Sequence, residues 1–264
     1  MAVGDVLLIN AAIAAISFLA AWRVAVSIKD VTFVDSYWAI GMVIIAASTF
    51  LITPGLGAHK VALLGLCLVW GARLGLYLLW RWRKQGPDRR YVTMLGRAQR
   101  EKGWSFAKAS LLYVFALQAP LQFIVCLPVQ LGQIDGAPNV FGLLAWTGVA
   151  LAVTGIAFES IGDWQLARFR ADPANHEKVM QRGLWRYTRH PNYFGDACAW
   201  WGLYLIAAET SVGIWAFPGP LLLTFLLVKW SGAPTVERRL RKSRPGYEDY
   251  VNRTSGFVPW PPKA

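Results

Sequence analysis

The strongest chemical signal in this chain is a cationic segment that runs directly into an apolar one. Positions 182–201 read RGLWRYTRHPNYFGDACAWW. Four cationic or titratable side chains fall within nine residues of that segment: Arg182, Arg186, Arg189 and His190. The apolar part that follows carries one acid, Asp196. Because arginines hold phosphates and carboxylates through bidentate hydrogen bonds, the pattern predicts a site for a large anion at a bilayer surface.

Two other stretches place polar side chains along one side of an apolar segment. Arg73 and Tyr77 are four residues apart. Glu159, Asp163 and Arg170 follow one another at four- and seven-residue spacing. Since such spacings share a helical face, and an arginine inside an apolar span is costly unless paired or hydrated, we expect a polar cavity here. The alternatives are snorkelling of the arginine to the surface and an ordinary mixed-charge helix end.

An acid stands at the start of the second apolar stretch, in the sequence VDSYW at 34–38. Asp35 is either an interfacial acid stabilised by the positive end of the helix dipole or a group that faces a polar cavity. Under the second interpretation Asp35 or Tyr37 is the catalytic candidate, because an acid or a phenol polarises a carbonyl or donates a proton.

Together these residue types suit a nucleotide cofactor. Arginines bind phosphates, carboxylates or an asparagine bind ribose and amide groups, and aromatic rings cover ring faces. S-adenosylmethionine would need fewer cations and a similar acid. The sequence has no Rossmann or P-loop fingerprint and no spacing typical of a metal site. Three cysteines lie in apolar spans without CxxC spacing, and we interpret them as small core residues: Cys67, Cys126 and Cys198.

The elements that must position these residues are membrane helices. Hydrophobic residues make up 55% of the 264 residues and charged residues only 16%. Several apolar runs reach the roughly 20 residues that cross a hydrocarbon core. We therefore predict an all-α polytopic membrane protein, a bundle of about seven transmembrane helices. The expected spans are 3–21, 33–53, 60–80, 110–130, 139–161, 192–210 and 212–230.

The distribution of charge predicts the orientation. Nearly all of the 27 Lys and Arg residues fall in the first, third and fifth inter-span loops or after the last span, and none precedes Arg23. The positive-inside rule then puts the N-terminus outside and the C-terminus in the cytoplasm. The net charge of +12 is therefore a topology signal and does not indicate a nucleic-acid partner. We expect the basic loop 81–108 to form a turn at Gly86–Asp88 and a short amphipathic surface helix.

Four motifs of this chain also occur together elsewhere. They are GLWRYTRHPNYFGD with WWGLYL, the tail pattern SGAP…E…RPGYEDY…FVPWPP, the VDxxW start of the second span and the DxRY at 88–91. This set resembles the steroid 5-alpha-reductase C-terminal family, most closely its uncharacterised bacterial branch. The resemblance is strongest over 155–264. With no separate soluble domain visible, we expect one membrane domain over 1–264, with N-terminal helices over 1–155 and a reductase-like cofactor region after them.

Members of that family bind NADPH near the cytoplasmic side of seven membrane helices. The resemblance therefore implies cofactor contacts for three matched pairs: Asp163 and Arg170 (D-x6-R), Asn192 and Asp196 (N-x3-E/D), and Arg73 and Tyr77 (R-x3-Y). The segment around RHPNY adds three further cofactor-binding candidates: Tyr187, Arg189 and His190.

The catalytic side of the family's pattern is not reproduced. The reductases carry a Gln-Glu pair in the second helix and a tyrosine three residues before the third-helix arginine. Here the second span offers Asp35, Ser36 and Tyr37, and Trp70 precedes Arg73. The resemblance implies hydride transfer from NADPH to a polarised double bond of a lipid-like, steroid or isoprenoid-type substrate. For the catalytic group we rely on the residues themselves, which offer Asp35 or Tyr37.

Two other functions fit the same residues. Membrane isoprenylcysteine and phospholipid methyltransferases have a similar RHP-Y segment and a similar E…Y..Y tail, so an S-adenosylmethionine-dependent methyltransferase is the first alternative. A non-enzymatic lipid-binding membrane protein is the second, although buried charge without a ligand is costly. The expected partners are a lipid-soluble small molecule and the bilayer, and the expected location is the bacterial inner membrane.

Overall fold

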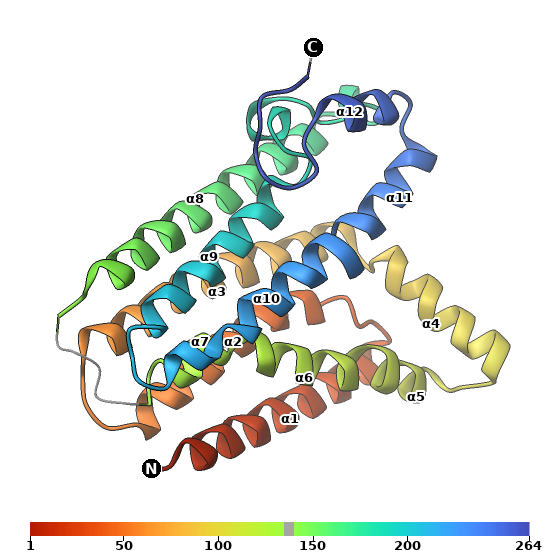
Figure 1. Cartoon of the computed structure of the whole chain (residues 1–264). Helices are drawn as coiled ribbons and strands as arrows, with labels where there is room; N and C mark the ends of the chain where they lie inside the picture. The colour runs from red at the N-terminus through yellow and green to blue at the C-terminus, as the bar shows by residue number, and fades with distance from the viewer. Residues whose placement is uncertain (135–139, 264) are drawn as a thin grey trace.

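Helices make up the regular structure of this protein (Figure 1). The computed structural model describes residues 1–134 and 140–263, and within those ranges it contains no strand, only one isolated bridge between Thr188 and Ser255. The elements before residue 135 are α1 (Val3–Ile28), α2 (Val34–Ile52), α3 (Ala58–Gln85), α4 (Arg89–Lys102), α5 (Phe106–Ser110), η1 (Leu111–Phe115), α6 (Ala116–Val125) and α7 (Leu127–Leu131). Those after it are α8 (Leu143–Ala171), η2 (Pro173–Asn175), η3 (Gly183–Arg186), α9 (Pro191–Ala207), η4 (Gly213–Ala216), α10 (Pro218–Phe225), η5 (Leu226–Trp230), α11 (Ala233–Ser243) and α12 (Tyr247–Arg253).

Six helical runs in the described part of the chain are long and apolar enough to cross a membrane. They are Val3–Ile28, Val34–Ile52, Ala58–Gln85, Phe106–Val125, Leu143–Ala171 and Gly213–Ser243. The prediction of an all-α polytopic membrane protein is confirmed at this level. The expected sixth span, 192–210, corresponds to α9, whose 17 residues are fewer than the roughly 20 of a straight crossing.

Three helices extend well beyond their expected spans, and the first is α1, which continues past 3–21 to Ile28. α3 continues past the expected 60–80 to Gln85, and α8 continues past 139–161, whose first position lies outside the described residues, to Ala171. Helical hydrogen bonding persists into charged sequence, so hydropathy detects only the apolar part of a helix. α3 ends where Gly86 adopts a left-handed φ of 71°, which a residue without a Cβ tolerates.

The expected span 110–130 is a broken helix. It is divided into α5, the π-helical η1, α6 with Pro120 in its interior, and α7. A proline inside a helix removes one backbone hydrogen bond and bends the axis. Polar side chains near the bend bond to other helices instead: the Gln122 amide donates to the carbonyl of Trp38 at 2.8 Å.

α8 and α9 lie side by side because glycines let their backbones touch (Figure 1). A Cβ built on Gly155 would lie 2.5 Å from the carbonyl oxygen of Gly195, and one on Gly202 would lie 2.5 Å from that of Gly148. Small residues at a helix interface permit this close approach in membranes. The contact fixes the register that sets the acids of α8 opposite the polar residues of α9.

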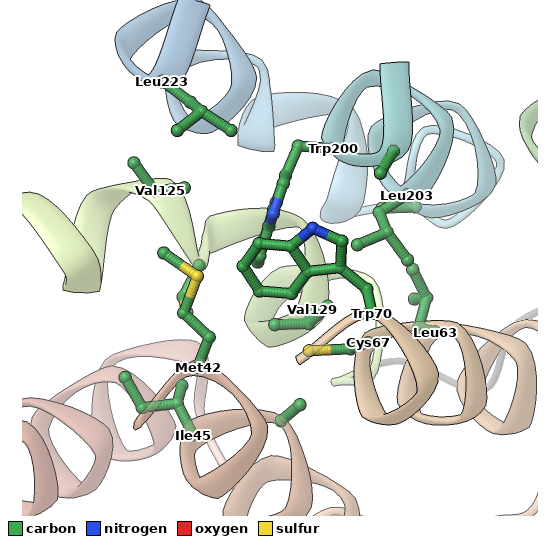
Figure 2. Close-up of a cluster of buried hydrophobic side chains, with 14 of the residues drawn as sticks. Met42, Ile45, Leu63, Cys67, Trp70, Val125, Val129, Trp200, Leu203 and Leu223 are labelled. Carbon is green, nitrogen blue, oxygen red and sulfur yellow. The ribbon is translucent and has the colours of Figure 1, made fainter. Parts of the chain in front are cut away.

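The centre of the bundle is apolar and aromatic (Figure 2). Trp70 of α3 and Trp200 of α9 meet edge to face with ring centroids 5.2 Å apart. Cys67 and Cys126 are fully buried in the same core, and Cys198 is a half-buried free thiol. The described cysteines thus match the expected role of small packing residues.

The two ends of the bundle differ in charge. We call the end where α3 and α8 terminate, with α4, α11 and α12, the basic end, and the end where α3 and α8 begin the opposite end (Figure 1). The expected surface helix of loop 81–108 is α4, whose N-terminal amide at Arg90 is capped by Asp88. The chain after α12 folds back over the basic end, where the Trp260 amide donates to the carbonyl of Tyr187 at 2.9 Å.

Candidate functional site

A group of buried acids surrounds one arginine where α3, α8 and α9 meet. Arg73 lies 2.5 Å from Glu159 as an ion pair and donates a hydrogen bond of 2.7 Å to Asp163. The amide of Asn192 donates to the other oxygen of Asp163 at 3.2 Å. Asp196 lies one helical turn further along α9 and is buried. We call these five residues the acid cluster, and the predicted polar cavity around Arg73 corresponds to it.

The acid cluster does not satisfy its own polar atoms. It holds three carboxyl groups and a single guanidinium. Among the described residues, the Arg73 Nε and one carboxyl oxygen of Asp196 have no hydrogen-bond partner. Buried polar atoms in proteins are nearly always paired, and an excess of buried charge of one sign is costly. The cluster is therefore suited to receive polar or cationic groups from a ligand.

Several arginines with little acidic pairing gather next to the acid cluster. We call them the arginine group: Arg81, Arg89, Arg170, Arg239 and Arg244. Within the described chain their side chains make no hydrogen bond, and their one ion pair is a long contact of 3.9 Å between Arg81 and Asp35. Arg170 is close enough to Arg81, Arg239 and Arg244 to repel them electrostatically. Like charges held together in this way create a strong field for an anion.

Tyr77 connects the arginine group to the acid cluster. Its half-buried hydroxyl interacts electrostatically with Asp163 on one side and with Arg81 and Arg170 on the other. Its ring stacks on Trp80 with centroids 5.9 Å apart. A polar strip thus runs from the acids inside the bundle to the arginines at its basic end.

A cavity of about 200 Å³ opens at the end of this strip. Helix α2, the end of α3, the turn before α4 and helix α11 form its walls. Its charged lining residues are Asp35, Arg81, Asp88, Arg89 and Arg239. The cavity therefore has more positive than negative groups on its wall, which suits a phosphorylated ligand.

Asp35 faces this cavity and has a tyrosine as its closest partner. The Tyr91 hydroxyl donates to Asp35 at 2.7 Å, and Arg90 donates to the same carboxylate at 3.1 Å. The amide of Gln118 donates to the Tyr91 oxygen at 3.3 Å. Burial raises the pKa of Tyr91 well above its usual value, and the negative charge of Asp35 raises it further. Tyr91 is therefore held as a neutral proton donor beside a carboxylate.

The other predicted catalytic residue, Tyr37, is not brought to this place. Two residues along a helix point to nearly opposite sides, so Tyr37 faces α1 while Asp35 faces α4. Its ring packs edge to face on Phe18 with centroids 4.9 Å apart. Of the two catalytic candidates, Asp35 lines the cavity and Tyr37 does not, and Tyr91 supplies the phenol next to Asp35. The DxRY motif was the sequence signal that could have identified it.

Three predicted cofactor-binding residues lie in a structural contact with the tail instead. Arg189 and His190 both reach Glu237 of α11, at 2.8 and 2.9 Å. Arg189 also donates to the carbonyl of Thr254 at 2.6 Å. Tyr187 is exposed, and its carbonyl accepts the tail amide already described. The structure thus brings Arg73, Tyr77, Asp163, Arg170, Asn192 and Asp196 to one place, and it places Tyr187, Arg189 and His190 elsewhere.

Tyr193 is a residue of the RHPNY motif that sequence reasoning did not select. Its ring stacks on His190 with centroids 5.2 Å apart and planes within 7°. It interacts electrostatically with Arg81 and Asp35 at the cavity and with Asp163 of the acid cluster. Only the packing of α9 against α3 and α8 reveals this position between the two polar regions.

Comparison with known proteins places the chain in a family. A family model described as "Protein of unknown function (DUF1295)" matches residues 21–254. An "Uncharacterized protein C594.04c" of Schizosaccharomyces pombe is 22% identical over 272 residues, which cover 90% of this chain and 75% of that protein. No solved structure gives a significant match. Because the family model covers most of its length, this chain belongs to the DUF1295 family.

Proposed function

We propose that this protein is a membrane-embedded, NADPH-dependent reductase that acts on a polarised double bond of a lipid-like substrate. The observation that carries the proposal is the position of the arginine group, whose one ion pair within the described chain is the long Arg81–Asp35 contact, directly beside the incompletely paired acid cluster. The motif resemblance to the steroid 5-alpha-reductase C-terminal family supports the same assignment.

The residues present fit a dinucleotide phosphate. The arginine group would hold the phosphates, because guanidinium groups bind them bidentately and remain charged. Asp163, Asn192 and Asp196 offer acceptors and a donor for ribose and amide groups, and the free Asp196 oxygen is one such acceptor. NADPH, when bound, supplies the hydride.

The proton for the same reaction would come from the Asp35–Tyr91 pair. Reduction of a conjugated double bond adds one hydride and one proton, so a neutral donor is needed near the substrate carbonyl. Tyr91 keeps its proton because it is buried beside Asp35, and Arg90 balances the charge of that carboxylate. The lipid-like substrate would enter between the apolar helices.

The membrane orientation follows from the same charge pattern. We propose that the basic end faces the bacterial cytoplasm, where NADPH is available, and that the N-terminus lies outside. In this arrangement α9 is the sixth of seven membrane segments along the chain. It is shorter than the others and packs against α3, α8 and α10.

NADPH binding to the purified protein in lipid nanodiscs tests this proposal. Ligand at about a hundred times its Kd stabilises a fold by about 2.7 kcal/mol, which thermal unfolding detects. We expect NADPH to stabilise the wild type against thermal unfolding. This stabilisation should be absent in the variants Arg170→Ala and Asp163→Asn. Arg97→Ala is the control, because that arginine pairs only with Glu101 on the outer surface of α4. Absence of NADPH stabilisation in the wild type contradicts the proposal.

One observation favours the methyltransferase alternative. Three carboxyl groups face one guanidinium in the acid cluster, and this excess of negative charge also suits the cationic sulfonium and ammonium groups of S-adenosylmethionine. The arginine group argues against it, since that cofactor has no phosphate. Stabilisation by S-adenosylmethionine and not by NADPH would assign the methyltransferase, and stabilisation by neither would favour a lipid-binding protein.

A further inference from the structure

A second cavity, of about 360 Å³, lies on the outer side of α8 at the basic end. The last two turns of α8 form one wall, with Trp164, Arg168 and Phe169. The loop between η2 and η3 forms the other, with Met180 and Arg182. None of the residues that line it belongs to the acid cluster or to the arginine group. It is therefore a site separate from the one proposed for the cofactor.

Hydrogen bonds next to the cavity join its two walls, helix α8 and the loop before η3. The amide of Leu184 donates to the side chain of Gln165 at 3.0 Å, and the indole of Trp185 donates to the carbonyl of Gly162 at 3.0 Å. Gly183 has a left-handed φ of 60°, and a Cβ there would lie 2.3 Å from Gln165. The left-handed φ favours glycine at this position, and the Gln165 side chain packs directly against it. The cavity is thus a built feature of the fold.

The cavity offers two cations and no free acid. Arg168 lies over the ring of Trp164 at 5.6 Å, and Arg182 is exposed, with no side-chain hydrogen bond or ion pair within the described chain. The one acid on the wall, Asp172, accepts hydrogen bonds from Ala174 and Asn175 of its own turn. The two arginines therefore remain available for an anion.

The outer face of α8 leads from the membrane into this cavity. Ile161, Trp164 and Arg168 follow one another at three- and four-residue spacing and are all exposed. Toward the basic end, the side chains on this face change from an aliphatic chain to an indole ring and then to a guanidinium group. That order is the order of hydrocarbon, interface and headgroup in a bilayer. Because α8 is long and apolar enough to span a membrane, acyl chains would cover this face.

We propose that this cavity binds the headgroup of an anionic phospholipid. Arg168 and Arg182 would hold the phosphodiester, and the acyl chains would lie along Ile161 and Trp164. The volume is within the range of about 300–1,000 Å³ that is usual for small-molecule sites. A lipid reaches it directly from the bilayer, and the lipid's negative charge matches the two arginines.

Native mass spectrometry of the intact protein tests this site. The protein is released from nanodiscs that contain equal amounts of phosphatidylglycerol and phosphatidylcholine with matched acyl chains. We expect the wild type to retain phosphatidylglycerol preferentially. In the double variant Arg168→Gln/Arg182→Gln, the ratio of retained phosphatidylglycerol to phosphatidylcholine should fall about thirty-fold. This is the effect expected when two arginines near an anionic headgroup lose their charge. Arg83→Gln is the matched control, an exposed arginine at the end of α3 that does not line the cavity.

Three results would overturn the proposal. They are an unchanged lipid preference in the double variant, an equal loss in Arg83→Gln, and retention of glycerol 3-phosphate in place of the lipid. Trp164→Ala should reduce retention of both lipids without changing the headgroup preference, because it removes only apolar contact. NADPH stabilisation should be unchanged in all three variants, so the test of the lipid site is independent of the test of the proposed cofactor site.

Discussion

The two ends of the bundle use similar charged residues in opposite ways. At the opposite end three described charged or titratable side chains have partners: Lys60 donates to the carbonyls of Thr53 and Gly55 at 2.5 and 3.1 Å, and His59 lies 2.7 Å from Glu209. Glu209 also accepts the Ala145 amide at the start of α8. At the basic end the arginine group lacks such partners. The difference indicates that one end is built for stability and the other for a ligand.

The largest effect is expected from Arg73, the only cation of the acid cluster. Arg73→Met removes the partner of two buried carboxyl groups and should lower the free energy of unfolding by about 3–5 kcal/mol. Chemical unfolding in detergent measures this change. Adding Glu159→Gln and Asp163→Asn to Arg73→Met should restore part of the loss, because it removes the unpaired charges. No restoration would show that the arginine stabilises the fold by packing alone.

A loss of about 2–3 kcal/mol is expected from Glu209→Ala at the opposite end, since it removes the partner of His59 and the cap of α8. The effect should depend on pH. Burial acts to raise the pKa of Glu209, but hydrogen bonds from His59, Ala145 and Gly142 hold it below its usual value.

The direction of this pH dependence follows from linkage. A depressed carboxyl pKa contributes stability above the ordinary value of about 4.5, and the contribution disappears as pH falls through the folded-state pKa. Thermal unfolding of wild type and Glu209→Gln should therefore differ at neutral pH and converge in acid. A constant difference across this range would contradict the assignment.

A change of about 1 kcal/mol is expected for Tyr91→Phe, which removes the hydrogen bond to Asp35 and the one from Gln118. NADPH stabilisation should be retained, because Tyr91 itself does not line the cavity that holds part of the arginine group. Tyr37→Phe is the matched comparison, and it should change stability less, since the Tyr37 hydroxyl has no hydrogen-bond partner within the described chain. Equal effects of the two variants would remove the distinction between these tyrosines.

The smallest change in the ligand-free protein is expected for Arg170→Ala and Arg239→Ala. Neither side chain makes a hydrogen bond or ion pair within the described chain, so the free energy of unfolding should stay within about 0.5 kcal/mol of the wild type. NADPH stabilisation should fall in both, and in the wild type it should weaken as salt rises, because screening reduces attraction between exposed charges. Clear destabilisation of the ligand-free variants would show that the arginine group is structural.

The contrast between Asp163 and Asp35 shows how far sequence reasoning reached at the site. The spacing of Glu159, Asp163 and Arg170 along α8 was predictable, because helical periodicity is a local property. The need of Arg73 for a partner was predictable as well, because a lone arginine inside an apolar helix is costly. The partner of Asp35 was not, since Tyr91 lies 56 positions away on a surface helix.

The residues of the segment 182–201, which carries the strongest chemical signal in the sequence, lie in two different places in the structure. Asn192 and Asp196 join the acid cluster because the glycines of α8 and α9 bring the two backbones together. Arg189 and His190 turn instead toward Glu237, 48 and 47 positions away, and fasten the tail. Residues that are neighbours in sequence thus have different roles, some in the acid cluster and others in the contact with the tail.

The sequence alone determined the helical membrane class, the polar faces of α3 and α8, the kink before α7 and the surface helix α4. Each of these depends on hydrophobicity, periodicity or proline chemistry within a few turns of chain. The tertiary structure alone decided which acids meet Arg73, which tyrosine meets Asp35 and which arginines stay unpaired. Those outcomes depend on how closely and in what register the helices pack, and packing joins residues that no local pattern connects.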